Sequence, residues 1–303
     1  MDLDFLRVVV ALGFLFVAAV MDWRRRVVKD VVWITLGAAA LAIVELELLV
    51  GSAAWFLHLL TAATAILYFG AFFGKEMRGE KRFTFRPLRF GAYLAALIFL
   101  LATWRLSSEN ETTLGAFYRL LTMPGMIVVA HGLYEYDLLR GGADAKALMA
   151  LSLLFPGIYP HLGSFPIFHP TPAAEPIIAV TFPFAFVVLV DSALLFLAVP
   201  LFLLARNVAS GTAQFPRALV GLRVPLDGLP KFAWFMDRVE DGEPVFHYFP
   251  RRKEDREEQV RLLREHGLTH VWVTPQLPFL VAMFVGAILA VVFGNLLLAF
   301  FAR

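Results

Sequence analysis

Residues 4–33 read DFLRVVVALGFLFVAAVMDWRRRVVKDVVW, an apolar run that ends in an aspartate and three arginines before a second apolar run begins. A stretch of about 20 apolar residues spans the hydrocarbon core of a bilayer as one helix. The three arginines follow the run, whereas a secretory signal peptide carries its cations before the apolar core. We therefore predict a retained membrane helix here.

Similar runs recur along the 303 residues, of which 59% are hydrophobic and only 17% charged. Helices and closed barrels satisfy every backbone group in lipid, and these runs are too long for barrel strands. We predict an all-α membrane bundle of about eight spans, with six to eight tolerated, and a small cytoplasmic α/β appendage. The predicted spans are residues 4–21, 31–50, 54–74, 90–104, 115–134, 145–158, 176–204 and 277–301. Pro183 and Pro200 predict a kink or break in the seventh.

Lysine and arginine gather in alternate loops, the asymmetry that orients membrane proteins. The basic loops are residues 22–30, 75–90 and 135–146, and the loops between them hold few cations. With eight spans, the three basic loops fall on one side, which the rule places in the cytoplasm. Both ends of the chain are then expected outside.

Residues 205–275 form the one long polar segment, and it falls on the cytoplasmic side. The patterns VFHYFP (245–250) and LTHVWVT (268–274) predict strands. Between them, KEDREEQVRLLREH (253–266) predicts a charged helix that Gly267 stops. We therefore divide the chain into a membrane domain (1–204), this α/β appendage (205–275) and a C-terminal membrane helix (276–303).

Two aspartates stand at predicted helix ends on the cytoplasmic side. Asp22 ends the first span, and Asp144 opens the sixth in GGADAKALMAL (141–151). Ionisable groups at membrane depth are costly, so each is a functional hypothesis. Two carboxylates that share a site do not both ionise readily, so one can activate water while the other donates a proton. Peptide hydrolysis needs these two roles.

The neighbours of Asp144 admit two interpretations. Gly141 and Gly142 can adopt positive φ and let a substrate backbone approach, but a plain Gly-Gly turn with Asp144 as helix N-cap explains the same residues. For Asp22 the plainer alternative is an acid paired with the arginines that follow it. Lys146 is expected to favour a charged Asp144, and helix dipoles suggest Asp144 as the base and Asp22 as the proton donor.

Other acidic residues have simpler interpretations. Asp30 begins the second span, where N-capping is the expected role. Glu45 and Glu47 lie at the outer end of that span and are expected to be solvated. Asp191 lies within the seventh span and is expected to hydrogen-bond inside the bundle.

GGADAKALMAL resembles the GxGD motif of type IV prepilin peptidases, in the form found in archaeal preflagellin peptidases, with Ala143 in place of the second glycine of the motif. DWRRRVVKDVVW (22–33) is similar to the first-aspartate segment of that family, and residues 267–295 also resemble archaeal members. The resemblance implies a GxGD-type membrane aspartyl protease whose peptidase domain is 1–204. Its catalytic residues would be Asp22 and Asp144. The supporting motif residues would be Gly141, Gly142, Ala143 and Lys146.

The resemblance also implies a substrate and a location. The enzyme would cleave short class III signal peptides from preflagellin and pilin-like precursors, at the cytoplasmic face of the plasma membrane. Its partners would be these precursors and the lipid bilayer, without nucleic acid. Bacterial relatives add a cysteine-bound zinc region and methylate the product. This chain has no cysteine, so we expect no metal, no cofactor and no methylation.

Two other classes of function stay open. The first is a proton-coupled transporter that uses Asp22, Asp144 and Asp191, although the sequence shows no inverted repeat. The second is a non-catalytic scaffold of a pilus or secretion machine that acts through residues 205–275. The sequence does not fix the oligomeric state, the precursor or its cleavage site.

Overall fold

A computed structural model describes the chain except for residues 1–2, 74–86, 140, 241, 249–254 and 302–303. The chain forms two compact units, which we name the helical unit (Met1–Ala193 with Pro278–Arg303) and the strand unit (Leu194–Leu277). The functional division at residues 204 and 275 remains a prediction.

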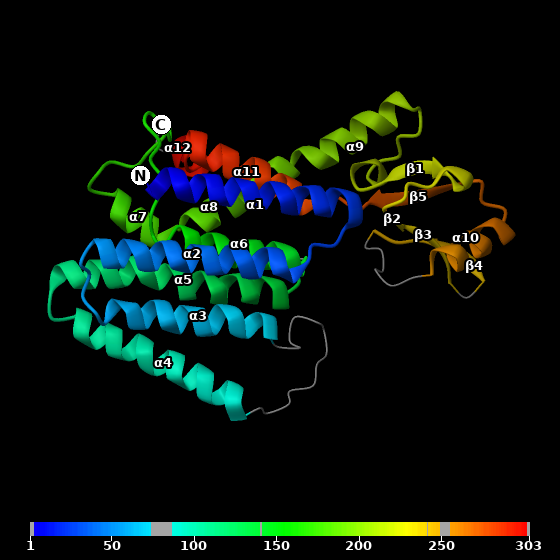
Figure 1. Cartoon of the computed structure of the whole chain (residues 1–303). Helices are drawn as coiled ribbons and strands as arrows, with labels where there is room; N and C mark the ends of the chain where they lie inside the picture. Colours follow the sequence, from blue (N-terminus) through cyan, green and yellow to red (C-terminus); the bar gives the residue numbers. More distant parts are fainter. Residues whose placement is uncertain (1–2, 74–86, 140, 241, 249–254, 302–303) are drawn as a thin grey trace. The chain divides into compact units, whose positions relative to one another are not determined.

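The helical unit consists of helices, the longer of which lie side by side across the view of Figure 1. They are α1 (Leu3–Arg25), α2 (Asp30–Val50), α3 (Leu57–Phe73), α4 (Pro87–Ser107), α5 (Glu111–Glu135), α6 (Gly142–Leu154), α7 (Glu175–Thr181), α8 (Phe184–Phe196, whose last turn falls in the strand unit), α11 (Phe279–Phe293) and α12 (Leu296–Phe301). α1 packs on α11, and both α2 and α5 pack on α6. From Asp144 to Leu154, every residue of α6 except Lys146 is buried, so α6 is enclosed by its neighbours.

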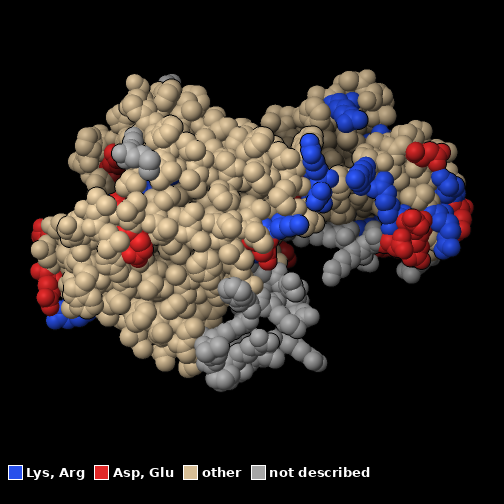
Figure 2. Space-filling model, viewed as in Figure 1, with Lys and Arg blue, Asp and Glu red and all other residues tan. Residues whose placement is uncertain are grey.

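Five helical stretches in the described part of the chain are long and apolar enough to cross a membrane. They are Leu3–Arg25, Asp30–Val50, Phe90–Ser107, Glu111–Glu135 and Phe184–Ala209, and Leu57–Phe72 and Phe279–Phe293 are shorter apolar helices. The face of the helical unit in Figure 2 is largely uncharged over the middle of its helices. The predicted helical membrane bundle is confirmed. The described part of the bundle has five full-length spans, fewer than the eight expected. This lower number is still compatible with the predicted fold, and α6, which was predicted as the sixth span, is a short helix enclosed by its neighbours.

Proline interrupts the seventh predicted span as expected. α7 ends at Thr181 and α8 begins at Phe184, with Pro183 between them. A second interruption falls at Leu197, before α9 (Ala198–Ala209). Pro200 lies in the first turn of α9, where a missing N–H costs no intrahelical hydrogen bond.

The connection from α1 to α2 and the start of α6 lie at the same end of the helical unit, and the N-terminus and α12 lie at the other end (Figure 1). This arrangement agrees with the alternation of basic loops in the sequence. The cations at 75–86 and Arg140, which contributed to that alternation, lie outside the described residues.

The strand unit holds a three-stranded antiparallel sheet of order β1-β5-β2, with β1 (Leu222–Pro225), β5 (His270–Pro275) and β2 (Ala233–Phe235). The rest of the strand unit is the last turn of α8, the helix α9, a hairpin of β3 (Asp237–Glu240) and β4 (Glu243–Phe246), the helix α10 (Arg256–Glu265), the short 3₁₀ turns η2 (Arg217–Leu219) and η3 (Leu226–Gly228), and the connections between them. Leu222 pairs with Val273 in the register of the sheet, and both belong to a core that includes Leu263 of α10.

The predicted helix at 253–266 corresponds to α10 and the predicted strand at 268–274 to β5, each with small shifts at its ends. The strand predicted at 245–250 is confirmed only in part, because Val245 and Phe246 belong to β4 whereas His247 and Tyr248 lie beyond its end. Residues 249–250 and 253–254 lie outside the described residues. Gly267 follows α10 with φ +74°, a conformation that glycine adopts without strain, so it stops the helix as expected.

Candidate active site

Asp144 lies in the first turn of α6 and is only 9% exposed. Its backbone N–H donates to the Gly141 carbonyl at 3.0 Å, and its carboxylate accepts the backbone N–H of Gly141. Gly141 is therefore the N-cap, and Asp144 is the third helical residue that reaches back to it, as in one half of a capping box. The alternative in which Asp144 itself is the N-cap is wrong.

Gly141 and Gly142 are not used in the way the sequence suggested. Gly141 has an extended backbone with φ −107°, and Gly142 begins the helix, so the expectation of positive φ is wrong. What requires glycine at 141 is a close approach: a Cβ there would lie 2.9 Å from Cγ of Asp144. A Cβ on Gly142 would meet the Tyr134 ring at an ordinary 3.5 Å.

Ala143 occupies the position where the motif has its second glycine. It lies in the first turn of α6, and its side chain packs against the core of the helical unit. Because alanine is the best helix former, the helical backbone at 143 suits it. The turn before Asp144 is therefore compatible with alanine at this position.

Asp22 lies half-buried in the last turn of α1. Arg26, with φ +55° just beyond the helix, folds back so that its Nη1 donates to the Asp22 carbonyl at 3.2 Å. Its guanidinium charge also interacts with the Asp22 carboxylate, which in addition accepts the backbone N–H of Leu280 in the first turn of α11. Arg24 and Arg25 are exposed, so the pairing expected from the sequence falls to Arg26.

The two aspartates come from segments far apart in the chain, but the fold brings them to the same end of the helical unit. α1 contacts α6, and the carboxylates of Asp22 and Asp144 interact electrostatically. A site that contains both carboxylates is therefore compatible with this fold.

Lys146 does not point its charge at Asp144. Its Nζ lies 2.6 Å from Oδ1 of Asp30 and 5.2 Å from the centre of the Phe72 ring. Asp30 is the first residue of α2, and Lys29 holds the N-cap position without a side-chain cap, so the N-capping role expected of Asp30 is wrong. The sequence missed this pair because its partners lie on different helices.

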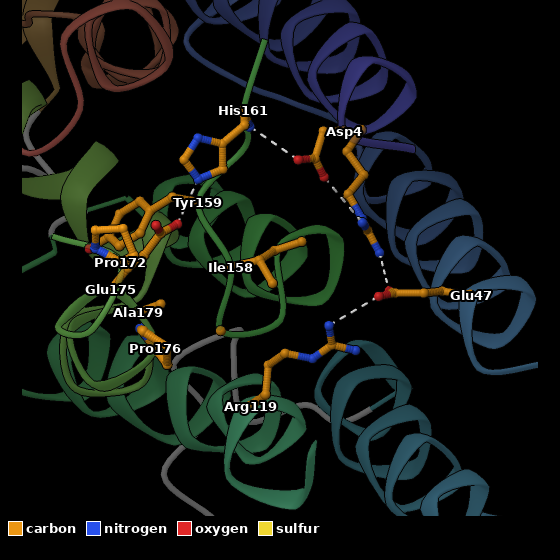
Figure 3. Close-up of a pocket in the computed structure, with 12 residues that line it drawn as sticks. Asp4, Glu47, Arg119, Ile158, Tyr159, His161, Pro172, Glu175, Pro176 and Ala179 are labelled. Carbon is orange, nitrogen blue, oxygen red and sulfur yellow. Dashed lines mark hydrogen bonds and ion pairs between the residues drawn. The ribbon is translucent and has the colours of Figure 1, made fainter. Parts of the chain in front are cut away.

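A second polar site lies at the opposite end of α1 from Asp22. A cavity of about 430 Å³ lies there. Figure 3 shows Asp4, Glu47, Arg119 and His161 among the residues that line it. Asp4 and Asp22 are separated along α1 by roughly 27 Å, from a rise of 1.5 Å per residue. The cavity is therefore distinct from the aspartate pair.

Charge pairs surround this cavity. Glu47 accepts from Nη2 of Arg7 at 2.5 Å and lies 3.1 Å from Nη1 of Arg119. The solvated state expected for Glu47 is wrong, because α1 and α5 each present an arginine to the end of α2. Glu45 is also paired, at 2.5 Å from Nδ1 of His58.

Asp191 is buried within α8, 1% exposed. Its carboxylate lies near the backbone N–H of Leu296 at the start of α12, but neither carboxylate oxygen makes a hydrogen bond within the described residues. The hydrogen bond that the sequence suggested for this polar group is therefore not made within the described residues.

Comparison with known proteins bears on the C-terminal part of the chain. Residues 213–296 match the family described as Archaeal Peptidase A24 C-terminus Type II. The match supports membership of the archaeal preflagellin and prepilin peptidase family. The resemblance seen in the sequence is thereby confirmed, and a peptidase role is supported. The chain is also 27% identical over 286 residues to an uncharacterized protein of Methanocaldococcus jannaschii, covering 90% of this chain and 87% of that protein.

A multi-pass membrane protein follows from the apolar helices together with this membrane peptidase family. The matched segment begins after Asp22 and Asp144, so the match does not cover these two residues.

Proposed function

We propose that this chain is a membrane aspartyl endopeptidase that removes short class III signal peptides from preflagellin-like and prepilin-like precursors. In this proposal Asp22 and Asp144 are the catalytic pair, and the site faces the cytoplasm. The observation that carries it is the electrostatic interaction of these two carboxylates, which α1 and α6 bring to one end of the helical unit. The family match supports the same class of enzyme.

The chemistry follows from the pair. One carboxylate takes a proton from a water molecule while the water oxygen attacks the carbonyl carbon of the scissile peptide. The other carries a proton and gives it to the leaving amine as the C–N bond breaks. The products are a carboxylic acid and an amine, and the dyad returns to one proton shared between two groups. Lys146 pairs with Asp30, so the sequence argument that made Asp144 the base loses one of its supports.

The surroundings suit a substrate with a basic segment before an apolar helix. Glu135 and Asp137, between α5 and α6, are exposed close in sequence to Asp144 and offer negative charge to such a segment. The cytoplasmic location of the site is inferred from the charge of the loops. The loop at residues 22–30, which begins with Asp22, is rich in arginine and lysine and is expected in the cytoplasm.

The test is cleavage by the full chain in membranes, with a panel of preflagellin-like and pilin-like precursors and mass spectrometry of the new N-terminus. We expect Asp22→Asn and Asp144→Asn each to abolish cleavage while inserting normally, and Asp191→Asn to retain it. The new N-terminus should be unmethylated. Unchanged cleavage in both single variants would reject the dyad, and an N-methylated product would reject the simple peptidase.

A further inference from the structure

The ion pair between Lys146 and Asp30 joins the two segments that bear the proposed catalytic aspartates. Lys146 stands two residues after Asp144 on α6, and its side chain is 12% exposed. Asp30 begins α2, directly after the short connection that follows Asp22 and the end of α1. The N···O distance is 2.6 Å, so this is a charge-assisted hydrogen bond.

The ammonium group is held on two sides. The Asp30 carboxylate lies on one side, and the ring of Phe72 from α3 lies 5.2 Å from Nζ. A lysine charge with so little exposure is costly unless it is paired. Three helices, α2, α3 and α6, therefore meet at one charged group.

The side chains of Lys146 and Asp144 leave α6 in nearly opposite directions. Successive residues of an α-helix are about 100° apart, so residues 144 and 146 point about 200° apart around the axis of α6. Lys146 thus anchors α6 on the side opposite to Asp144. If α6 rotated or slid, the ion pair would break, and the Asp144 carboxylate would move relative to Asp22.

We propose that Asp30 and Lys146 form a positioning pair, which fixes the rotation and height of α6 so that Asp144 meets Asp22. The pair does not touch the substrate or the reacting atoms. This inference rests on the proposed function for its catalytic meaning, while the placement of α6 that it describes can be measured without any substrate.

The first experiment measures cleavage of a precursor that the unaltered full chain processes. Lys146→Met and Asp30→Asn should each lower kcat by roughly tenfold or more, because a misplacement of about 1 Å can cost a factor of ~100. KM should change little, since the substrate contacts remain. The double variant should lose no more than the worse single variant, as expected for coupled residues. Lys146→Arg keeps the charge and should recover most of kcat.

The matched control is Lys29→Met, which removes an exposed lysine beside Asp30. A stabilising pair without a positioning role would reduce the amount of folded protein but leave kcat per folded molecule unchanged. Equal kcat in Lys146→Met and Lys29→Met would overturn the proposal, as would losses that simply add in the double variant.

The second experiment uses the absence of cysteine from the chain. Asp22→Cys and Asp144→Cys are introduced together, and the yield of cross-link with a short bismaleimide is measured in detergent. Adding Lys146→Met should lower the yield several-fold, and adding Lys29→Met should not. An unchanged yield with Lys146→Met would overturn the inference. If the unaltered chain cleaves no precursor, the proposed function fails, and the cross-linking result still decides whether the pair positions α6.

Discussion

Replacing Gly141 with alanine tests most directly how Asp144 is held. A Cβ at Gly141 would lie 2.9 Å from Cγ of Asp144, whereas two carbon atoms rest at about 3.5 Å or more. The carboxyl carbon must therefore retreat by at least roughly 0.6 Å, the difference between these two distances, and Oδ2 of Asp144, which is closer still to the new Cβ, must move further. It also gives up the hydrogen bond from the Gly141 N–H, which to a charged acceptor is worth roughly 1.5–3 kcal/mol.

A catalytic group that is misplaced by about 1 Å can lose a factor of ~100 in rate. We therefore expect Gly141→Ala to lower kcat for precursor cleavage by about 10- to 100-fold. The measurement is the initial rate of cleavage by the full chain in membranes, normalised to the amount of inserted protein. KM should change much less than kcat, because Gly141 acts through Asp144.

Gly142→Ala is the matched control, since it adds the same methyl group one residue further along. The new Cβ would meet only the Tyr134 ring at 3.5 Å, so no atom has to move. Alanine should also stabilise the helix by up to about 1 kcal/mol, and less in its first turn. Equal activity of the two variants would refute the argument that the carboxylate of Asp144 sets the need for glycine at 141.

Two further predictions concern stability. Glu47→Gln weakens the partner of Arg7, which is 2% exposed, and should lower the free energy of unfolding by about 3 kcal/mol, measured by thermal unfolding in detergent. Glu109→Gln breaks an exposed pair with Arg105 and should lower it by less than about 1 kcal/mol. Equal losses in the two variants would contradict the role given to Glu47. In the strand unit, burial raises the pKa of Asp237, whose carboxylate accepts the Trp272 N–H at 2.6 Å. The folded state then binds the proton of this carboxyl more tightly than the unfolded chain, so its contribution to stability is present at low pH and is lost as the pH rises through the folded pKa. Asp237→Asn keeps a hydrogen-bond acceptor and should remove this part of the pH dependence from hydrogen exchange at the Trp272 amide. Asp237→Ala removes the acceptor and should lower the protection of that amide by about 1–3 kcal/mol. Unchanged exchange in Asp237→Ala would contradict the hydrogen bond between Asp237 and Trp272.

The sequence was sufficient to predict the membrane helices and to place Asp22 and Asp144 at the same end of the helical bundle. Apolar runs of membrane length leave few alternatives to a helix, and the alternation of basic loops assigns each helix end to a side. The strands β1, β2 and β3 were missed because each has only three or four residues, too few for a period of two to stand out.

Charge pairs between helices were the other feature beyond the reach of the sequence. Asp30 could only be assigned from its place at a helix start, and Glu47 from its place at a helix end. Their true partners, Lys146 and the two arginines at positions 7 and 119, lie on helices whose rotation the sequence does not fix. Apolar periodicity could not fix that rotation for α6, because the helix is hydrophobic nearly all round.

The contact of Asp22 with Leu280 connects the proposed site to the part of the chain that the family match covers. Leu280 lies within the matched residues 213–296, and its backbone N–H is donated to the carboxylate of Asp22. Pro278, the N-cap of α11, offers no side chain to that helix end, so a carboxylate from α1 occupies the place of a capping group. The position of Asp22 therefore depends on where α11 begins, four residues after β5 ends at Pro275. The family match does not cover Asp22, but it covers Leu280, whose backbone N–H helps to position the Asp22 carboxylate.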